Sequence, residues 1–190
     1  MRREAEELNV AFLVNSRGGN TRMVAGAIKK AVAATDATVV HLAAIPDTAE
    51  AGVIDAEVDA LGPADVVMVG FWCDKGTCSP AVASLLSKLS GKKVFLFGTC
   101  GFGASDDYYA QIIDRVTSNL PLDAEVIGWT MCQGKMGTAV RKRYEAVLAE
   151  NPEDARAKML LDNWAAAKSH PDKEDLDRMA AAAAEALANA

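Results

Sequence analysis

Short apolar runs separated by amphipathic segments recur along the first 137 residues of this chain. The apolar runs predict five strands, each expected to be buried on both faces of a sheet: 9–14, 38–42, 66–70, 93–98 and 126–131. Apolar residues three or four positions apart predict helices between most of them. Alternating strands and helices are typical of a parallel α/β sheet with right-handed crossovers and helices on both faces.

Several local signals support these helices. Ser79 followed by Pro80 is a typical helix start, and Ser105 followed by two aspartates predicts another. Residues 44–64 show the weakest pattern, with a short helix predicted around 50–60. Trp129 is expected to pack in the core.

Beyond residue 137 the pattern is purely helical. We expect a helix around Val140 and Tyr144 to cover the sheet, and two further helices at 152–168 and from Pro171 to the end. Some of their apolar residues need burial against the domain or in a homodimer contact: Met159, Leu160, Trp164, Leu176 and Met179. We therefore predict a single domain, 1–190, with a core of about 8–150 and a helical extension, 151–190.

Composition narrows the functional classes. With 190 residues, of which 51% are hydrophobic, the chain can bury one core. A net charge of -6 argues against a nucleic-acid-binding surface. No apolar run reaches the roughly 20 residues that a membrane span needs, and no signal peptide is evident at the start. We expect a cytoplasmic protein that binds neither nucleic acid nor membranes.

The segment after the first predicted strand is the most informative part of the chain. It would place hydroxyl groups, glycines and unpaired backbone N–H groups at the N-terminus of a helix, which suits a phosphate dianion. Other phosphate-binding motifs fit less well, because the chain has no G-x-x-x-x-G-K-[ST] and 101–103 lack the third glycine of the dinucleotide fingerprint. The residues of this segment are Ser16, Arg17, Gly18, Gly19, Asn20 and Thr21.

Three other predicted strand ends are also followed by loops rich in glycine and small polar residues, at 70–79, 98–109 and 132–137. In parallel sheets, ligands bind beyond the carboxyl ends of the strands. Trp72 and Phe102 would offer stacking faces to a flat ring. Turn glycines and packed aromatics explain any one loop, but four such loops at one edge favour a ligand site.

Three of these loops, taken in order, resemble those of flavodoxins. The first loop of that family, S/T-x-T-G-x-T, is similar to 16–21, with Gly18 replacing the middle hydroxyl. The second resembles Gly70-Phe71-Trp72 followed by Gly76, and the third resembles 98–103 followed by a tyrosine. The resemblance covers residues 8 to about 150. It implies a flavodoxin-like three-layer α/β sandwich with strand order 2-1-3-4-5, and the helical tail is similar to that of a subgroup of bacterial flavodoxin family proteins.

The resemblance also implies that FMN is the cofactor. No side chain is an obvious general acid or base, and this absence favours an electron carrier with a reductase as its redox partner. An FMN-dependent NAD(P)H oxidoreductase with a quinone or similar acceptor is the alternative, and a binding module without flavin is a third. The residues implied to bind FMN are Ser16, Arg17, Gly18, Gly19, Asn20, Thr21, Phe71, Trp72, Cys73, Gly76, Thr99, Cys100, Gly101, Phe102, Gly103 and Tyr108.

The cysteines are considered separately, because all four fall in or beside the predicted loops: Cys73, Cys78, Cys100 and Cys132. They are too few and too unevenly spaced for a secreted disulfide framework, so free thiols are expected. Converging thiolates could instead hold an iron–sulfur cluster or zinc, or form a redox dithiol. We assign no metal site.

Overall fold

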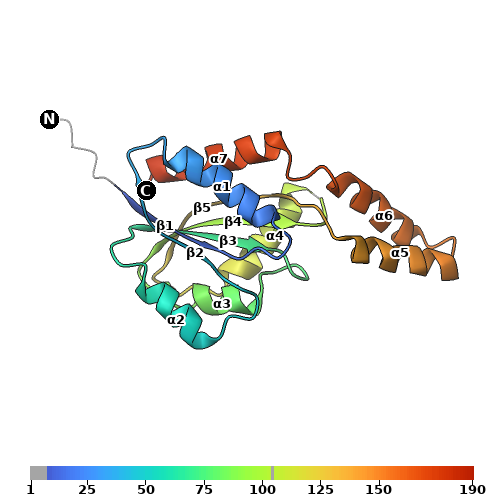
Figure 1. Cartoon of the computed structure of the whole chain (residues 1–190), viewed down its shortest axis with the longest axis horizontal. Coiled ribbons are helices and arrows are strands. Elements are labelled where there is room, and N and C mark those ends of the chain that lie inside the picture. Colours follow the sequence, from blue (N-terminus) through green and yellow to red (C-terminus); the bar gives the residue numbers. More distant parts are fainter. Residues whose placement is uncertain (1–7, 104) are drawn as a thin grey trace.

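The computed structural model describes residues 8–103 and 105–190. The expectation about a signal peptide concerns the start of the chain, which lies outside the described residues. At the centre of the structure is a five-stranded sheet in the order β2-β1-β3-β4-β5, with parallel neighbours throughout (Figure 1). The predicted fold and strand order are confirmed. The strands are β1 (Asn9–Val14), β2 (Thr38–Ala44), β3 (Val66–Trp72), β4 (Lys93–Cys100) and β5 (Glu125–Gln133).

Alternate residues of the strands face two separate cores, one on each side of the sheet. One core is packed by α1 (Asn20–Val32) and α7 (Lys173–Ala188). The other is packed by α2 (Ala51–Asp59), α3 (Pro80–Leu86) and α4 (Asp106–Thr117). Figure 1 shows these two helical layers above and below the sheet. Because β1 and β3 each have a strand on both sides and a core on both faces, almost all of their side chains are buried.

The outer strands depart from the prediction of burial on both faces. Along β2, partly buried and exposed residues alternate, and Leu42 is 52% exposed. The first half of β5 is also largely open, and Trp129 is 38% exposed. An outer strand has one neighbour and less helix cover, so the predictions of two-face burial and of a core Trp129 are wrong. Trp164 is buried.

The helix after β5 does not cover the sheet as predicted. No residue of α5 (Thr138–Glu150) is buried. It packs instead against α6 (Ala155–Ala167), and the two form a hairpin that projects from the body of the protein (Figure 1). The physical reason is that α5 has only a weak apolar stripe and carries three consecutive cations at 141–143. Met159, on α6, is 48% exposed.

The last helix, α7, takes the place against the sheet that was expected for α5. It packs on α1, β4 and β5, with Met179 and Ala183 fully buried. A Cβ added at Gly128 of β5 would lie 3.3 Å from Cβ of Ala186, so the missing side chain allows α7 to approach closely. We therefore propose that α7 belongs to the core of the domain and that 138–169 form an insertion. No helix in the described part of the chain has the length and apolar character that crossing a membrane requires.

The contrast between α6 and α7 can be tested with matched methionine substitutions. Met179→Ala should lower the free energy of unfolding by about 2–5 kcal/mol, because it leaves a cavity in the core. Met159→Ala should change it by no more than about 0.5 kcal/mol, because this side chain is half exposed. Urea denaturation measures both values, and equal losses in the two variants would contradict the assignment of α7 to the core.

Candidate functional site

The loop between β1 and α1 presents a row of backbone N–H groups that have no acceptor among the described residues. Helix α1 begins at Asn20, after Gly19, whose φ of 89° lies in the left-handed region that favours glycine. The N-cap residue itself, Gly19, has no side chain that could cap this end. The hydroxyl of Ser16 accepts from the N–H of Arg22 at 3.2 Å, whereas the N–H groups of residues 17–21 make no hydrogen bond within the part of the chain described. This arrangement has the features of an anion-binding nest.

The first turn of α1 is fastened to the loops beside it. The hydroxyls of Thr21 and Thr99 share a hydrogen bond of 2.9 Å, and the two residues are 0% and 4% exposed. The side-chain amide of Asn20 donates to the carbonyl of Lys135, beyond β5, at 2.9 Å. Of the two predicted phosphate-binding hydroxyls, that of Thr21 is therefore directed into the protein, whereas that of Ser16 belongs to a partly exposed residue.

Sequence reasoning missed Asp47, whose carboxylate positions the Trp72 ring. The buried amide Nδ2 of Asn15 donates to the carbonyl of Ile45 at 2.8 Å and to Oδ1 of Asp47 at 2.9 Å. The same carboxylate oxygen accepts from the indole Nε1 of Trp72 at 2.8 Å. The signal available in the sequence was a polar residue soon after each of the first two strands, but the sequence does not show that these residues meet.

The aromatic residues predicted at the end of β3 have different environments. The guanidinium of Arg17 lies 5.4 Å from the centre of the Trp72 ring, in a cation–π contact. Trp72 is partly buried and keeps some accessible surface. Phe71 is fully buried and fills the space beside Gly98. Its side chain belongs to the core, so only its backbone could meet a ligand.

Beyond Trp72, the chain forms a tight turn. Asp74 and Thr77 exchange backbone hydrogen bonds of 2.8 and 3.1 Å, and between them Lys75 and Gly76 have φ values of 51° and 87°. The carbonyl of Gly76 accepts from the guanidinium of Arg115 on α4, at 3.0 Å. This hydrogen bond therefore holds the turn against α4.

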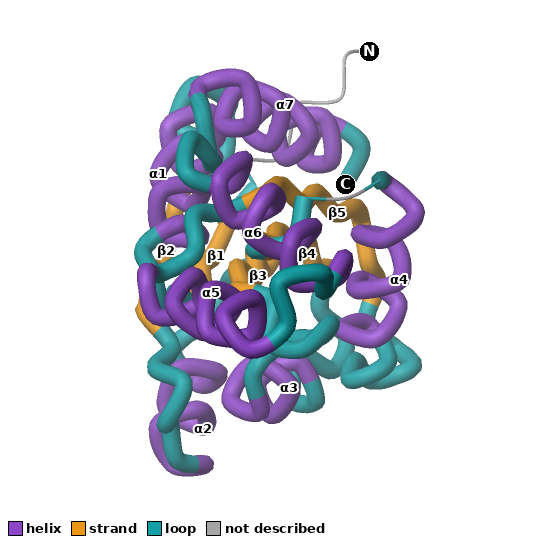
Figure 2. The backbone as a smooth tube through the Cα atoms, turned by 90° about the vertical axis from the view of Figure 1, so that its right-hand side faces the viewer, coloured by secondary structure: helices purple, strands orange, loops and turns teal. Residues whose placement is uncertain are grey.

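The loop after β4 is shaped by the protein itself. A Cβ at Gly101 would lie 2.6 Å from Met136, and one at Gly103 would lie 2.4 Å from Gln133. Asn163, on α6, accepts from the N–H of Gly103 at 3.0 Å and donates to the carbonyl of Gly101 at 3.1 Å. The α5–α6 hairpin, which lies in front of the strands in Figure 2, thus contacts a loop predicted to bind the cofactor.

An aromatic pair and two cysteines lie near this loop. Phe102 and Tyr108 pack edge to face, with ring centres 5.8 Å apart. A hydrogen bond from the thiol of Cys73 lowers the pKa of Cys100 to about 7. The N–H of Phe102 and the hydroxyl of Tyr108 lower this pKa further, whereas burial raises it. Burial and the negative charge of Cys100 raise the pKa of Tyr108 to about 12.

The four cysteines do not converge on one site. Cys73, Cys78 and Cys100 belong to the core on the α3 and α4 side, whereas Cys132 is buried in the opposite core. The arrangement therefore contradicts the hypothesis of one cluster held by all four thiolates. Burial raises the pKa of Cys132 to about 12, and it also raises the pKa of Cys78.

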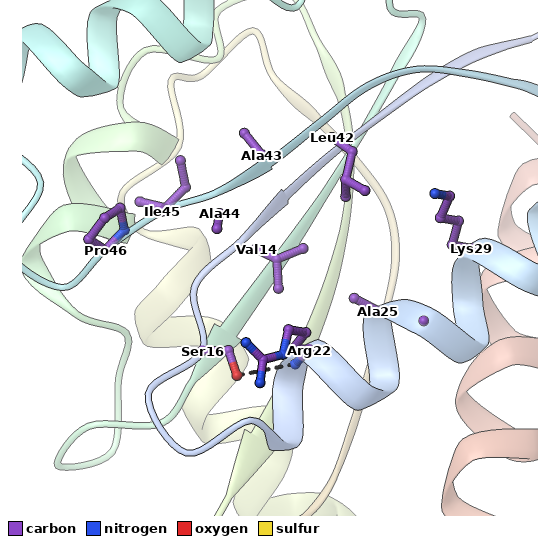
Figure 3. A pocket seen from close by; sticks show the side chains of 11 residues that line it. Val14, Ser16, Arg22, Ala25, Lys29, Leu42, Ala43, Ala44, Ile45 and Pro46 are labelled. Atoms are coloured by element: carbon purple, nitrogen blue, oxygen red, sulfur yellow. Dashed lines mark hydrogen bonds between the residues drawn. The ribbon is translucent and has the colours of Figure 1, made fainter.

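A cavity of about 380 Å³ lies on the other side of the first loop, between α1 and β2. Its walls are mostly apolar, with Val14 and Leu42 among the lining residues, and Ser16, Arg22 and Lys29 supply its polar groups (Figure 3). Of the residues predicted to bind the cofactor, it includes only Ser16. The apolar walls and two cations suit a small ligand with an apolar body and an anionic group.

A second group of ionisable side chains lies at the start of α7, where His170, Asp172 and Asp175 offer ligand atoms within 4.8 Å of one another. Asp172 and Asp175 form the capping box of α7, and His170 lies 2.5 Å from a carboxylate oxygen of Asp175. Capping of the helix therefore accounts for this group.

Comparisons with known proteins agree with the fold. The family model described as a flavodoxin domain matches residues 11–184. The chain is 36% identical over 177 residues to the flavodoxin-like domain-containing protein BilS of Clostridium symbiosum, covering 89% of this chain and 90% of that protein. It is 34% identical over 112 residues to BilS of Clostridioides difficile, covering 59% and 64%.

Solved structures show the same fold at low sequence identity. A flavodoxin, WrbA-like protein from Agrobacterium tumefaciens has a TM-score of 0.52 and 13% identity, with coverage of 97% of this chain and 100% of that chain. The rubredoxin oxygen:oxidoreductase from Desulfovibrio gigas also gives 0.52, with 17% identity and coverage of 95% and 36%.

The contact of Asn163 with the loop after β4 can be tested by amide hydrogen exchange. Asn163→Ala removes the acceptor of the Gly103 N–H, so exchange at Gly103 should accelerate by about tenfold. The neighbouring exposed residue provides a control, and Asp162→Ala should leave exchange at Gly103 unchanged. Unchanged exchange in Asn163→Ala would show that the hairpin does not hold this loop.

Proposed function

Because this chain belongs to the flavodoxin domain family, we propose that it is an FMN-binding electron-transfer protein that exchanges electrons with a reductase. The observation that carries this proposal is the nest of unpaired N–H groups at the start of α1, beside two loops that carry aromatic residues. A ligand with a phosphate at one end and a flat ring at the other would satisfy both parts.

The phosphate end of FMN fits the first loop. The N–H groups of Gly18, Gly19 and Asn20 would donate to its oxygens, and the hydroxyl of Ser16 lies at the edge of the same loop. The positive end of the α1 dipole would add to this attraction. Thr21 would act mainly as a brace, because its hydroxyl is bonded to Thr99.

The ring end would lie between the loops after β3 and β4. Trp72 is held by Asp47 and would offer a stacking face, while Phe102 and Tyr108 line the other loop. Backbone groups from Cys73 to Gly76 and from Thr99 to Gly101 would bond the polar edge of the ring.

When bound, the flavin would supply the redox chemistry, and the protein would set how readily it accepts electrons. Two carboxylates, Asp47 and Asp74, belong to the surrounding loops. Negative charges near the ring would make a reduced, anionic flavin less favourable and would lower its reduction potential. We also infer a bacterial cytoplasmic location, which the four free cysteines support.

Comparing FMN with riboflavin tests the phosphate part of the proposal without any substitution. FMN should bind at least about 100-fold more tightly, because riboflavin cannot form the charge-assisted hydrogen bonds to the nest. Gly19→Ala should weaken FMN binding about tenfold through strain at its positive φ, and it should change riboflavin binding little. Fluorescence titration measures both ligands. Equal affinities for FMN and riboflavin would contradict the assigned phosphate site.

Stopped-flow reduction tests the role of electron carrier. NADPH alone should bleach the visible flavin band of the FMN-loaded protein slowly, and adding a flavodoxin reductase should make the bleaching fast, because no predicted site binds the nicotinamide. Fast bleaching by NADH or NADPH alone would instead show an FMN-dependent oxidoreductase. A protein that binds no flavin would be a binding module on the same fold.

A further inference from the structure

Two cysteines meet at the carboxyl edge of the sheet, where Cys73 follows β3 and Cys100 is the last residue of β4. Trp72 of β3 is paired in register with Thr99 of β4, so the residues that follow them, Cys73 and Cys100, lie side by side. The backbone N–H of Cys73 donates to the carbonyl of Thr99 at 2.8 Å, which extends the alignment beyond the end of β3. Paired strands lie about 4.8 Å apart, and a disulfide accepts Cα separations of roughly 4.4–6.8 Å.

Their side chains point to the same side of the sheet. Cys100 is part of the core beneath α3 and α4, and Cys73 packs against the same core. Neither backbone needs to move far for the two sulfur atoms to bond.

The environment of Cys100 favours its thiolate. Hydrogen bonding to the thiol of Cys73, the backbone N–H of Phe102 and the hydroxyl of Tyr108 lowers the pKa of Cys100 to about 7. A thiolate is the reactive form of cysteine. Cys100 is 5% exposed and Cys73 is more open, so a small oxidant can reach the pair.

We propose that Cys73 and Cys100 form a redox-active dithiol that reduces hydrogen peroxide and closes to an intramolecular disulfide. The proposal goes beyond the electron-transfer function and does not require that the protein bind a flavin.

The chemistry balances in two steps. The thiolate of Cys100 attacks one peroxide oxygen, an S–O bond forms as the O–O bond breaks, and the released hydroxide takes a proton to leave as water. The thiol of Cys73 then loses its proton and attacks the sulfenic sulfur. The S–S bond forms as the S–O bond breaks, and a second water leaves. Together the two sulfurs lose two electrons, which reduce one peroxide to two waters, and an external dithiol can restore the pair by exchange.

The disulfide would join the start of the loop after β3 to the end of β4, where the next loop begins. The proposed function places the flavin ring between these two loops, so oxidation would link the two sides of that site covalently. Reduced flavins also generate hydrogen peroxide with dioxygen, and on the proposed function the oxidant would arise beside the pair.

The experiment treats the purified full-length chain, with and without added FMN, with one equivalent of hydrogen peroxide. Intact-mass analysis should show the loss of two hydrogen atoms, and peptide mapping should find Cys73 linked to Cys100. Cys78→Ala should behave like the wild type, because Cys78 is outside the pair. Cys73→Ala should stop at a sulfenic acid on Cys100 that dimedone traps, and Cys100→Ala should form no disulfide.

The pH dependence provides a second measurement. Below its pKa, Cys100 is protonated and unreactive, so the oxidation rate should rise with pH and reach half its maximum near pH 7. In Cys73→Ala the midpoint should move up, toward about 8.5, because the hydrogen bond from Cys73 is lost. Addition of oxygen atoms without loss of two hydrogens, or a disulfide mapped to Cys78 or Cys132, would overturn the proposal. Neither result would bear on FMN binding, which the riboflavin comparison tests separately.

Discussion

The parallel pairing of β1, β3, β4 and β5 is the constraint on which the rest of the structure depends. It brings the carboxyl ends of these strands, and the loops that follow them, to one edge of the sheet. The register is specific, because a slip of one residue would exchange the side chains that face the two cores. The same register places Thr99 beside Trp72, and thereby aligns the loops that carry the candidate site.

Polar contacts then hold these loops to one another. The Thr21–Thr99 bond joins the first loop to β4, and Asp47 joins the end of β1 to Trp72. Among the described residues, no buried side-chain nitrogen or oxygen lacks a hydrogen-bond partner. An unpaired buried polar group costs roughly 1–3 kcal/mol. Because every member of this network is paired, it avoids that cost, and an arrangement of the loops that broke these bonds would incur it.

The sequence predicted most of the fold because its strongest signals are local. Apolar runs and helix starts, such as Ser79 with Pro80, depend on neighbouring residues and mark the elements correctly. The place of α7 could not be predicted in this way. The periodicity shows that Met179 needs burial, but which surface covers it depends on Gly128 and α1, which are distant in sequence.

The candidate site shows the same division. The glycines and aromatics of its loops were visible, yet the residues that position them, Asp47 and Asn163, were not. Each acts through a contact with a distant part of the chain and has no local pattern of its own. Phe71 was assigned by its place in a motif, but the packing beside Gly98 directs its side chain into the core.

The loops differ in how firmly the protein itself holds them. Gly101 and Gly103 lie so close to Met136 and Gln133 that a side chain at either position would require its neighbour to move. Asn163 bonds both residues of this loop. Its shape is therefore set by packing before any ligand arrives, and a ligand would not have to supply the free energy of ordering it. By contrast, hydrogen bonds of Ser16 and Thr21 hold the nest at the start of α1 in place, while its N–H groups have no acceptor among the described residues. This loop therefore has a fixed backbone and donors that are free to bind an anion.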